Sequence, residues 1–128
     1  EDKGLQIVGA KMMQITAELA AMHYAVHQNK PFYEGLVKFM TSGPVLVLAV
    51  RGKGAIGICR KMMGATFGPN AEPGTIRGDL GMSMQCNLVH ASDSAETAVA
   101  EVRRFFKTEE LYTYEDALDT VIYADDEG

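Results

Sequence analysis

Residues 42–50 read Ser-Gly-Pro-Val-Leu-Val-Leu-Ala-Val, and this stretch decides how the chain folds. The Ser-Gly-Pro at its start ends the helical pattern that precedes it, because glycine and proline interrupt helices. Residues 45–50 are all apolar, which is typical of a central strand covered on both faces. Upstream, residues 5–12 alternate loosely between apolar and polar side chains and predict another strand. The sequence therefore predicts a sheet with helical segments between its strands.

Two helical patterns lie between these strands. Thr16 can cap a helix that runs to about residue 27, with Leu19, Met22 and Val26 along one apolar face. After Pro31 a shorter helix is expected, and its apolar stripe consists of Phe32, Leu36, Phe39 and Met40.

Two further helices are expected after residue 50. Residues 54–63 predict a helix that ends at Gly64, where glycine tolerates the left-handed backbone. Asp93 can cap a last helix, and Glu96 stands three residues on, as in a capping box. The side chains expected to point inward from this helix are Ala95, Ala98, Val99, Val102 and Phe106.

Residues 64–82 have neither helical nor strand periodicity, but they contain five glycines and two prolines. A long irregular segment inside a compact domain is usually functional or disordered. Thr66, Thr75 and Arg77 supply side chains that bind anions, among residues that let a ligand approach the backbone. We therefore interpret the segment as a binding loop.

Residues 84–90 alternate again and predict a strand that ends at His90, directly before a helix N-terminus. Strands joined by helices, with one-sided and two-sided apolar patterns mixed, indicate an α+β sandwich of the split βαβ type. A length of 128 residues is that of one domain, over residues 1–128.

The composition excludes several classes of protein. Hydrophobic residues make up 47% and charged residues 23% of the chain, which is ordinary for a soluble globular domain and excludes a disordered chain or a disulfide-rich miniprotein. The longest apolar run, residues 45–50, is far shorter than the ~20 residues that a membrane span needs. We therefore expect no interaction with a membrane.

The net charge of -5 is unevenly distributed. Residues 109–128 contain eight acids and no base, so the preceding residues hold nine of the 17 acids and all 12 Lys and Arg. Such a tail is usually a solvated, solubilising surface. The mildly basic body can collect a small anion. The pI near 5.1 argues against nucleic-acid binding, which usually shows a strongly basic patch.

The cysteines and two of the histidines predict no metal site. Cys59 and Cys86 lack a CxxC pairing, so we interpret them as small buried thiols in a reducing compartment. His23 and His27 have the i, i+4 spacing of two metal ligands on a helix, but no third ligand accompanies them in the HExxH manner. We interpret these two histidines as a solvated helix face.

His90 has the one suggestive setting among the histidines. The expected helix N-terminus beside it offers free N–H groups to a phosphate, and Arg60 and Arg77 can clamp further phosphate oxygens. A neutral imidazole is itself a nucleophile. This combination indicates phosphoryl transfer through a phosphohistidine, with a half-buried structural histidine as the alternative.

Three separate blocks of sequence closely resemble the signatures of nucleoside diphosphate kinases. Residues 87–94, Asn-Leu-Val-His-Ala-Ser-Asp-Ser, resemble the NxxH(G)SDS active-site signature, and residues 73–79 match the PGTIRGD segment. Residues 31–37, Pro-Phe-Tyr-Glu-Gly-Leu-Val, followed by Met40 and the Ser-Gly-Pro-Val at 42–45, match a third block. The resemblance covers essentially the whole chain, in order, and is very specific.

The resemblance implies a ferredoxin-like α/β sandwich, with an antiparallel sheet covered by helices, and a ping-pong reaction. The γ-phosphoryl group of a nucleoside triphosphate would pass to His90 and then to a second nucleoside diphosphate. For the nucleotide, the resemblance implies phosphate binding by Arg60, Thr66 and Arg77, base stacking by Phe32 and ribose contact by Asn87. For the nucleophile, it implies that Glu101 orients His90 with support from Ser92. Tyr24 would lie beside the transferred phosphoryl group.

The resemblance also implies the cofactor, the assembly and the location. Mg²⁺ would bridge the phosphates of the nucleotide and would not occupy a protein cage. The protein would be a cytoplasmic homo-oligomer, either a hexamer or a tetramer. The alternative function is a catalytically impaired nucleotide-binding or interaction module of the same fold.

The chain departs from the family pattern at three places. Ala91 replaces a glycine, and Met84 replaces a smaller valine that lines the base slot. The family also opens with a strand, a KPD-type motif and a helix that do not precede Glu1 here. Because an unpaired sheet edge aggregates, we expect residues 1–128 alone to be insoluble or molten, and the functional protein to carry an upstream βα segment.

Overall fold

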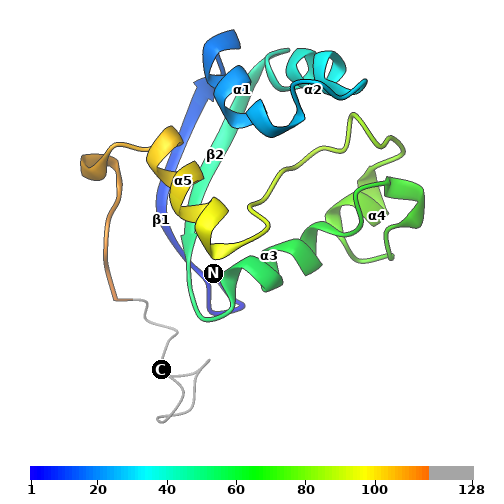
Figure 1. Cartoon of the computed structure of the whole chain (residues 1–128). Coiled ribbons are helices and arrows are strands. Elements are labelled where there is room, and N and C mark those ends of the chain that lie inside the picture. The colour runs from blue at the N-terminus through cyan, green and yellow to red at the C-terminus, as the bar shows by residue number, and fades with distance from the viewer. Residues whose placement is uncertain (116–128) are drawn as a thin grey trace.

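The computed structural model describes residues 1–115, and Figure 1 shows how their helices and strands are arranged. In chain order the elements are β1 (Gln6–Gln14), α1 (Ala17–His23), η1 (Ala25–His27), α2 (Tyr33–Met40), β2 (Pro44–Arg51), α3 (Ala55–Met63), η2 (Gly68–Asn70), α4 (Ile76–Leu80), α5 (Ala95–Phe105) and η3 (Thr108–Glu110), where η denotes a short 3-10 helix. The acidic residues from Asp116 onward lie outside the described residues.

The two strands that the sequence predicts first are confirmed, and they form an antiparallel pair. The register runs from Gln6 opposite Arg51 to Gln14 opposite Pro44, with an irregularity between Ile7 and Gly9. The irregularity leaves the Val8 carbonyl outside the ladder, and it accepts a hydrogen bond from the Tyr112 N–H at 2.7 Å. The chain after η3 therefore lies along the outer edge of β1 (Figure 1).

Within residues 1–115, the helices cover one face of the sheet. Gly9 and Ala49 lie on the covered side, and a Cβ at Gly9 would meet the Phe106 ring at 3.0 Å. On the opposite face the side chains of Met12 and Leu46 are 71% and 64% exposed. The expectation that residues 45–50 are covered on both faces is therefore wrong for the described residues, because every helix in Figure 1 that packs on the sheet lies on one side.

Helix α1 begins where the sequence predicts, but it ends earlier. Thr16 caps it by accepting a hydrogen bond from the Leu19 N–H at 3.1 Å. After His23 the backbone tightens into η1. The expected apolar face is wrong, because Met22 within α1 and Val26 within η1 are 61% and 82% exposed, whereas Tyr24 is buried.

The expected helices at α2, α3 and α5 are confirmed with small changes. Gly64 follows α3 with a φ of 88°, a conformation that glycine adopts without strain. The cap of α5 is Ser94, whose hydroxyl accepts from the Thr97 N–H at 3.1 Å, so the predicted cap at Asp93 is wrong. Phe106 is buried as expected, whereas Val99 is exposed.

Two segments differ from the sequence prediction. Within residues 64–82 the chain forms η2 and α4, and the Thr75 hydroxyl caps α4 by accepting from the Gly78 N–H at 3.0 Å. Residues 84–90 form no strand and pair with no described strand. This irregular course leaves Cys86 exposed, contrary to the expectation of two buried thiols, while burial raises the pKa of the Cys59 thiol.

The core lies between the covered face of the sheet and the helices. Its buried apolar side chains are Leu5, Ile15, Ala20, Tyr24, Ala49, Met63 and Phe106. Residues 81–94 return from α4 to α5 through the space between α2 and α3 (Figure 1), and they bring His90 close to α1 and α5. Among the described residues, no helix is long and apolar enough to cross a membrane.

Candidate active site

A buried arginine fixes the backbone that precedes His90. Arg77 is only 5% exposed, and its guanidinium donates to the carbonyls of Asn87 at 3.0 Å, Val89 at 2.6 Å and Gly64 at 3.2 Å. These bonds connect α4, the end of α3 and the segment that carries His90. Burial, and then the nearby charge of Arg60, lower the pKa of Arg77.

The same segment contains a tight turn immediately before His90. The Val89 N–H donates to the Asn87 carbonyl at 2.8 Å, and Leu88 between them has a φ of 72°. This is a γ-turn, a strained arrangement for a non-glycine residue. Such strain persists where surrounding contacts impose it, and it gathers at functional sites. Here the bonds from Arg77 impose it.

The His90 ring is oriented by a carboxylate on α5. Its Nε2 lies 3.2 Å from Oε2 of Glu101, which also accepts a hydrogen bond from the Ser92 hydroxyl at 2.7 Å. A carboxylate can only accept, so the neutral ring carries its proton on Nε2 and presents a lone pair on Nδ1. The side chain of His90 is 41% exposed and that of Glu101 is 14% exposed. The arrangement is that of an oriented imidazole nucleophile open to a ligand.

Two neighbouring residues at the C-terminal end of α1, its last residue His23 and the following Tyr24, form a wall behind His90. The Tyr24 ring lies 6.3 Å from the His90 ring, and burial, followed by the charge of Glu101, raises the pKa of Tyr24 to about 12. The His23 ring meets the His90 ring edge to face, with centroids 4.7 Å apart. The interpretation of His23 as a solvated residue is therefore wrong, and sequence reasoning missed its place beside the nucleophile.

The other expected phosphate-binding residues gather around the His90 segment. Arg60 is exposed on α3 and donates to the Ala91 carbonyl at 3.1 Å. The Asn87 amide donates to the Thr66 carbonyl at 3.5 Å. Together with Arg77, these contacts gather four of the five residues expected to bind the nucleotide around the segment that carries His90.

Phe32 is connected to His90 through other aromatic rings. It is half-exposed at the start of α2, with its ring 5.4 Å from that of His27 and 5.7 Å from the Lys30 ammonium. The His27 ring lies 6.4 Å from Tyr24, which in turn faces His90. Phe32 thus presents an open aromatic face at the rim of the site.

The cluster around His90 contains three side chains of the kind that bind metals. One ring nitrogen each of His23 and His90 and one oxygen of Glu101 lie within 4.8 Å of one another. However, the Arg104 guanidinium donates to Nδ1 of His23 at 3.1 Å, so a cation already faces this cluster. The side chains of His23, His90 and Glu101 are therefore held in place by hydrogen bonds.

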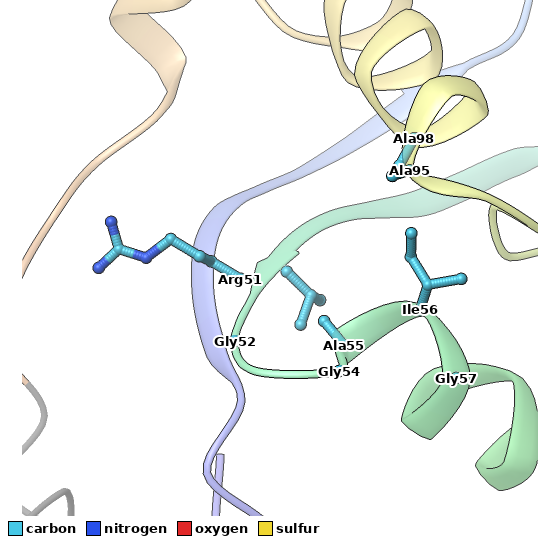
Figure 2. Close-up of a pocket in the computed structure, with 9 residues that line it drawn as sticks. Arg51, Gly52, Gly54, Ala55, Ile56, Gly57, Ala95 and Ala98 are labelled. Carbon is cyan, nitrogen blue, oxygen red and sulfur yellow. The ribbon is translucent and has the colours of Figure 1, made fainter. Parts of the chain in front are cut away.

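The described part of the chain also contains a hollow away from the His90 site. It has a volume of about 400 Å³ where β2 turns into α3, and its lining includes Val50, Ile56, Ala95 and Ala98. Figure 2 shows the Arg51 side chain pointing away from Ile56. The lining offers small apolar groups and includes none of the expected site residues.

Comparison with known proteins agrees with this geometry. Residues 1–111 match the family model described as nucleoside diphosphate kinase. A nucleoside diphosphate kinase of Carboxydothermus hydrogenoformans is 52% identical over 123 residues, which are 96% of this chain and 83% of that protein. A Bacillus cereus nucleoside diphosphate kinase is 50% identical over the same shares.

Solved structures show the same likeness. The halophilic nucleoside diphosphate kinase from Halobacterium salinarum, in complex with CDP, has a TM-score of 0.92 and 44% identity, over 95% of this chain and 82% of that one. A Babesia bovis family member has a TM-score of 0.89 and 40% identity, over 94% of this chain and 82% of that one. The expected ferredoxin-like α/β sandwich is confirmed, and the chain belongs to the nucleoside diphosphate kinase family of phosphotransferases.

Proposed function

We propose that this member of the family transfers the phosphoryl group through Nδ1 of His90 in a ping-pong reaction. Nδ1 attacks the γ-phosphorus of a nucleoside triphosphate, the bond to the bridging oxygen breaks, and the nucleoside diphosphate leaves. A second nucleoside diphosphate then takes the phosphoryl group and restores the free imidazole. The observation that carries this proposal is the contact of His90 Nε2 with Glu101, which leaves Nδ1 as the nucleophile.

The surrounding residues divide the remaining work. Arg60 is exposed beside the Ala91 carbonyl, so its guanidinium can reach a phosphate with little rearrangement. Arg77 is buried, and it contributes in two ways: its hydrogen bonds hold the backbone before His90, and its positive charge attracts the phosphates. Thr66 lies beside Asn87. We propose that Thr66 binds the phosphates and that Asn87 contacts the ribose hydroxyl.

The aromatic residues serve the base and the reacting centre. The half-exposed Phe32 ring can stack on any base, because every base offers a flat π-face. Tyr24 keeps its hydroxyl proton at physiological pH, since its pKa is raised to about 12. It can therefore donate a hydrogen bond near the transferred phosphoryl group.

The residues fit a reaction in which Mg²⁺ arrives with the nucleotide. Glu101 is engaged by His90 and Ser92, so the phosphates of the nucleotide would supply the ligands for the ion. When bound, Mg²⁺ neutralises charge that develops on the transferring group. Arg60 and Arg77 act on the same charge from the protein side.

We also expect a cytoplasmic homo-oligomer, hexameric or tetrameric. The apolar side chains of Met12, Leu46 and Leu48 on the open face of the sheet support self-association. Sedimentation analysis of the purified protein tests the assembly, and cell fractionation tests the location.

The decisive experiment is phosphoenzyme trapping. Incubation with Mg·ATP labelled at the γ-position should give a protein label that is stable in alkali and labile in acid, and His90→Ala should abolish both label and turnover. His27→Ala should still take the label, because His27 lies outside the hydrogen bonds of His90. A His90→Ala protein that is still labelled would overturn the assignment.

The same experiment separates the enzyme from the alternative. If the wild-type protein binds nucleotides but forms no label, it is an impaired nucleotide-binding module. Titration with a fluorescent nucleotide analogue measures binding independently of chemistry, and His90→Ala should keep this binding largely intact.

A further inference from the structure

Arg104 bridges from α5 to the wall behind the nucleophile. Its Nη1 donates to Nδ1 of His23 at 3.1 Å, across 81 positions of the chain. Because a guanidinium has only donors, Nδ1 of His23 must accept this bond. The neutral His23 ring therefore carries its proton on Nε2.

The other side of His23 faces the catalytic pair. The rings of His23 and His90 meet edge to face at an interplanar angle of 80°, and a His23 nitrogen lies within 4.8 Å of both His90 and Glu101. Phe105 closes the remaining side, with centroids 5.1 Å apart. His23 is thus enclosed between the last turns of α5 and the nucleophile.

We propose that Arg104 and His23 are positioning residues for phosphoryl transfer: Arg104 holds His23 in one tautomer and ring orientation, and the neutral His23 ring keeps His90 aligned on Glu101. This inference rests on the proposed phosphohistidine reaction. It assigns work to two residues that act through His90 and do not touch the nucleotide.

The electrostatic environment agrees with a neutral His23. The groups that face it are Tyr24 directly after α1, His90 on the returning segment, and Glu101, Arg104 and Phe105 on α5. Burial, followed by the charge of His90 and then that of Arg104, lowers the pKa of His23 to about 4 against the opposing effect of Glu101. A protonated His23 would compete with His90 for Glu101.

The experiment compares two neighbouring arginines of α5. The rate of phosphoenzyme formation is measured by rapid quench against pH for the wild-type protein, Arg104→Ala, Arg104→Lys and the control Arg103→Ala, which changes an exposed side chain. Because Arg104 contributes to the lowered pKa of His23, that pKa should rise without it, and the acid limb of the Arg104→Ala profile should move to higher pH. KM for ATP should stay unchanged.

The two other variants sharpen the result. Arg104→Lys keeps the charge and should restore most of the acid limb, whereas Arg103→Ala should follow the wild-type profile. Nitrogen-15 NMR of the histidine rings gives a readout independent of activity. The wild-type protein should show His23 protonated on Nε2, and Arg104→Ala should show a mixture of tautomers.

The outcomes are distinguishable. A profile of Arg104→Ala that coincides with those of the wild type and Arg103→Ala, or an unchanged His23 tautomer, overturns the positioning role. A wild-type protein that forms no phosphohistidine overturns the proposed function instead. If Arg104→Ala does not fold, the NMR spectrum of Arg104→Lys decides: a flexible ammonium holds the ring less firmly than the planar guanidinium, so a mixture of His23 tautomers supports the positioning role and an unchanged tautomer overturns it.

Discussion

At the scale of single residues, the nucleophile depends on a chain of hydrogen bonds that ends at Ser92. The Ser92 hydroxyl donates to the same Glu101 oxygen that faces His90. Without this donor the carboxylate can rotate away from Nε2, and the ring loses its fixed direction. Ser92 therefore acts on His90 although it does not touch it in the structure.

Ser92→Ala should lower kcat with little change in KM. A hydrogen bond to a charged group contributes about 1.5 kcal/mol at the low end of its range, which corresponds to roughly tenfold in rate. Steady-state kinetics with saturating ATP and a diphosphate acceptor measure the change. An unchanged kcat, or a loss confined to KM, would show that Glu101 holds His90 without help.

Phe32→Ala should have the opposite kinetic signature. Base stacking contributes roughly 1–3 kcal/mol to the bound substrate and the transition state alike, so KM should rise by about 5- to 150-fold while kcat stays nearly constant. Met62→Ala removes a half-exposed apolar side chain from α3 and serves as the control. An equal fall of kcat in Phe32→Ala would contradict the stacking role.

At the scale of elements, the local pattern predicts an element correctly where the long-range contacts of the fold agree with that pattern. The strands β1 and β2 and the helix α3 follow from apolar runs and a terminal glycine. Residues 84–90 have an equally good strand pattern, but no described strand pairs with them. Arg77 draws their carbonyls into a turn instead, and this long-range contact leaves no trace in the local pattern.

In the candidate site too, local motifs predict some features and miss others. The motifs around His90 predicted its surroundings because the residues involved belong to a few contiguous blocks. His23 was missed because the i, i+4 rule assumes a continuous helix. Helix α1 ends at His23 and η1 follows, so His27 turns toward Phe32 while His23 turns toward His90.

Two glycines in helices should respond oppositely to alanine. A Cβ at Gly57 in α3 would meet nothing within 4 Å, whereas a Cβ at Gly78 in α4 would lie 1.9 Å from the Glu72 carbonyl oxygen. Gly57→Ala should stabilise the protein by about 0.5–1 kcal/mol through helix propensity. Gly78→Ala should destabilise it by roughly 1–3 kcal/mol through overpacking.

Urea denaturation of both variants measures these changes. The Gly78→Ala result also reports on the site, because α4 carries Arg77 and a displaced helix would loosen the backbone before His90. A Gly78→Ala protein as stable as the wild type would show that the Glu72 carbonyl can move away from α4 without cost.

At the scale of the whole molecule, the candidate site exists only where distant parts of the chain meet. His23 and Tyr24 come from the end of α1 and the residue after it, Arg77 from α4, and Glu101 from α5. The strands β1 and β2 provide the platform on which α1 and α5 lie side by side (Figure 1). Each element contributes one or two side chains to the surroundings of a single imidazole. Folding and site assembly are therefore coupled, and the titration of a buried site residue affects the stability of the fold.

His23 should make this coupling visible as a pH dependence of stability. Its pKa is lowered to about 4 in the folded protein, against about 6.5 in an unfolded chain. Between these values the unfolded chain binds the proton and the folded protein does not, so the free energy of unfolding should fall as the pH is lowered from about 6.5 to about 4. The contribution of His23 over this range is roughly 2–3 kcal/mol.

Comparison with His23→Gln isolates this contribution, because glutamine stays neutral throughout. Urea unfolding of both proteins should show a difference in stability that is greatest near neutral pH and shrinks steadily below about pH 6.5, as only the wild type loses the contribution of its neutral imidazole. A difference that stays constant from neutral pH down to about pH 4.5 would mean that His23 titrates alike in the folded and unfolded chains. The ring would then be hydrated, and its enclosure by His90, Phe105 and Arg104 would not persist in solution.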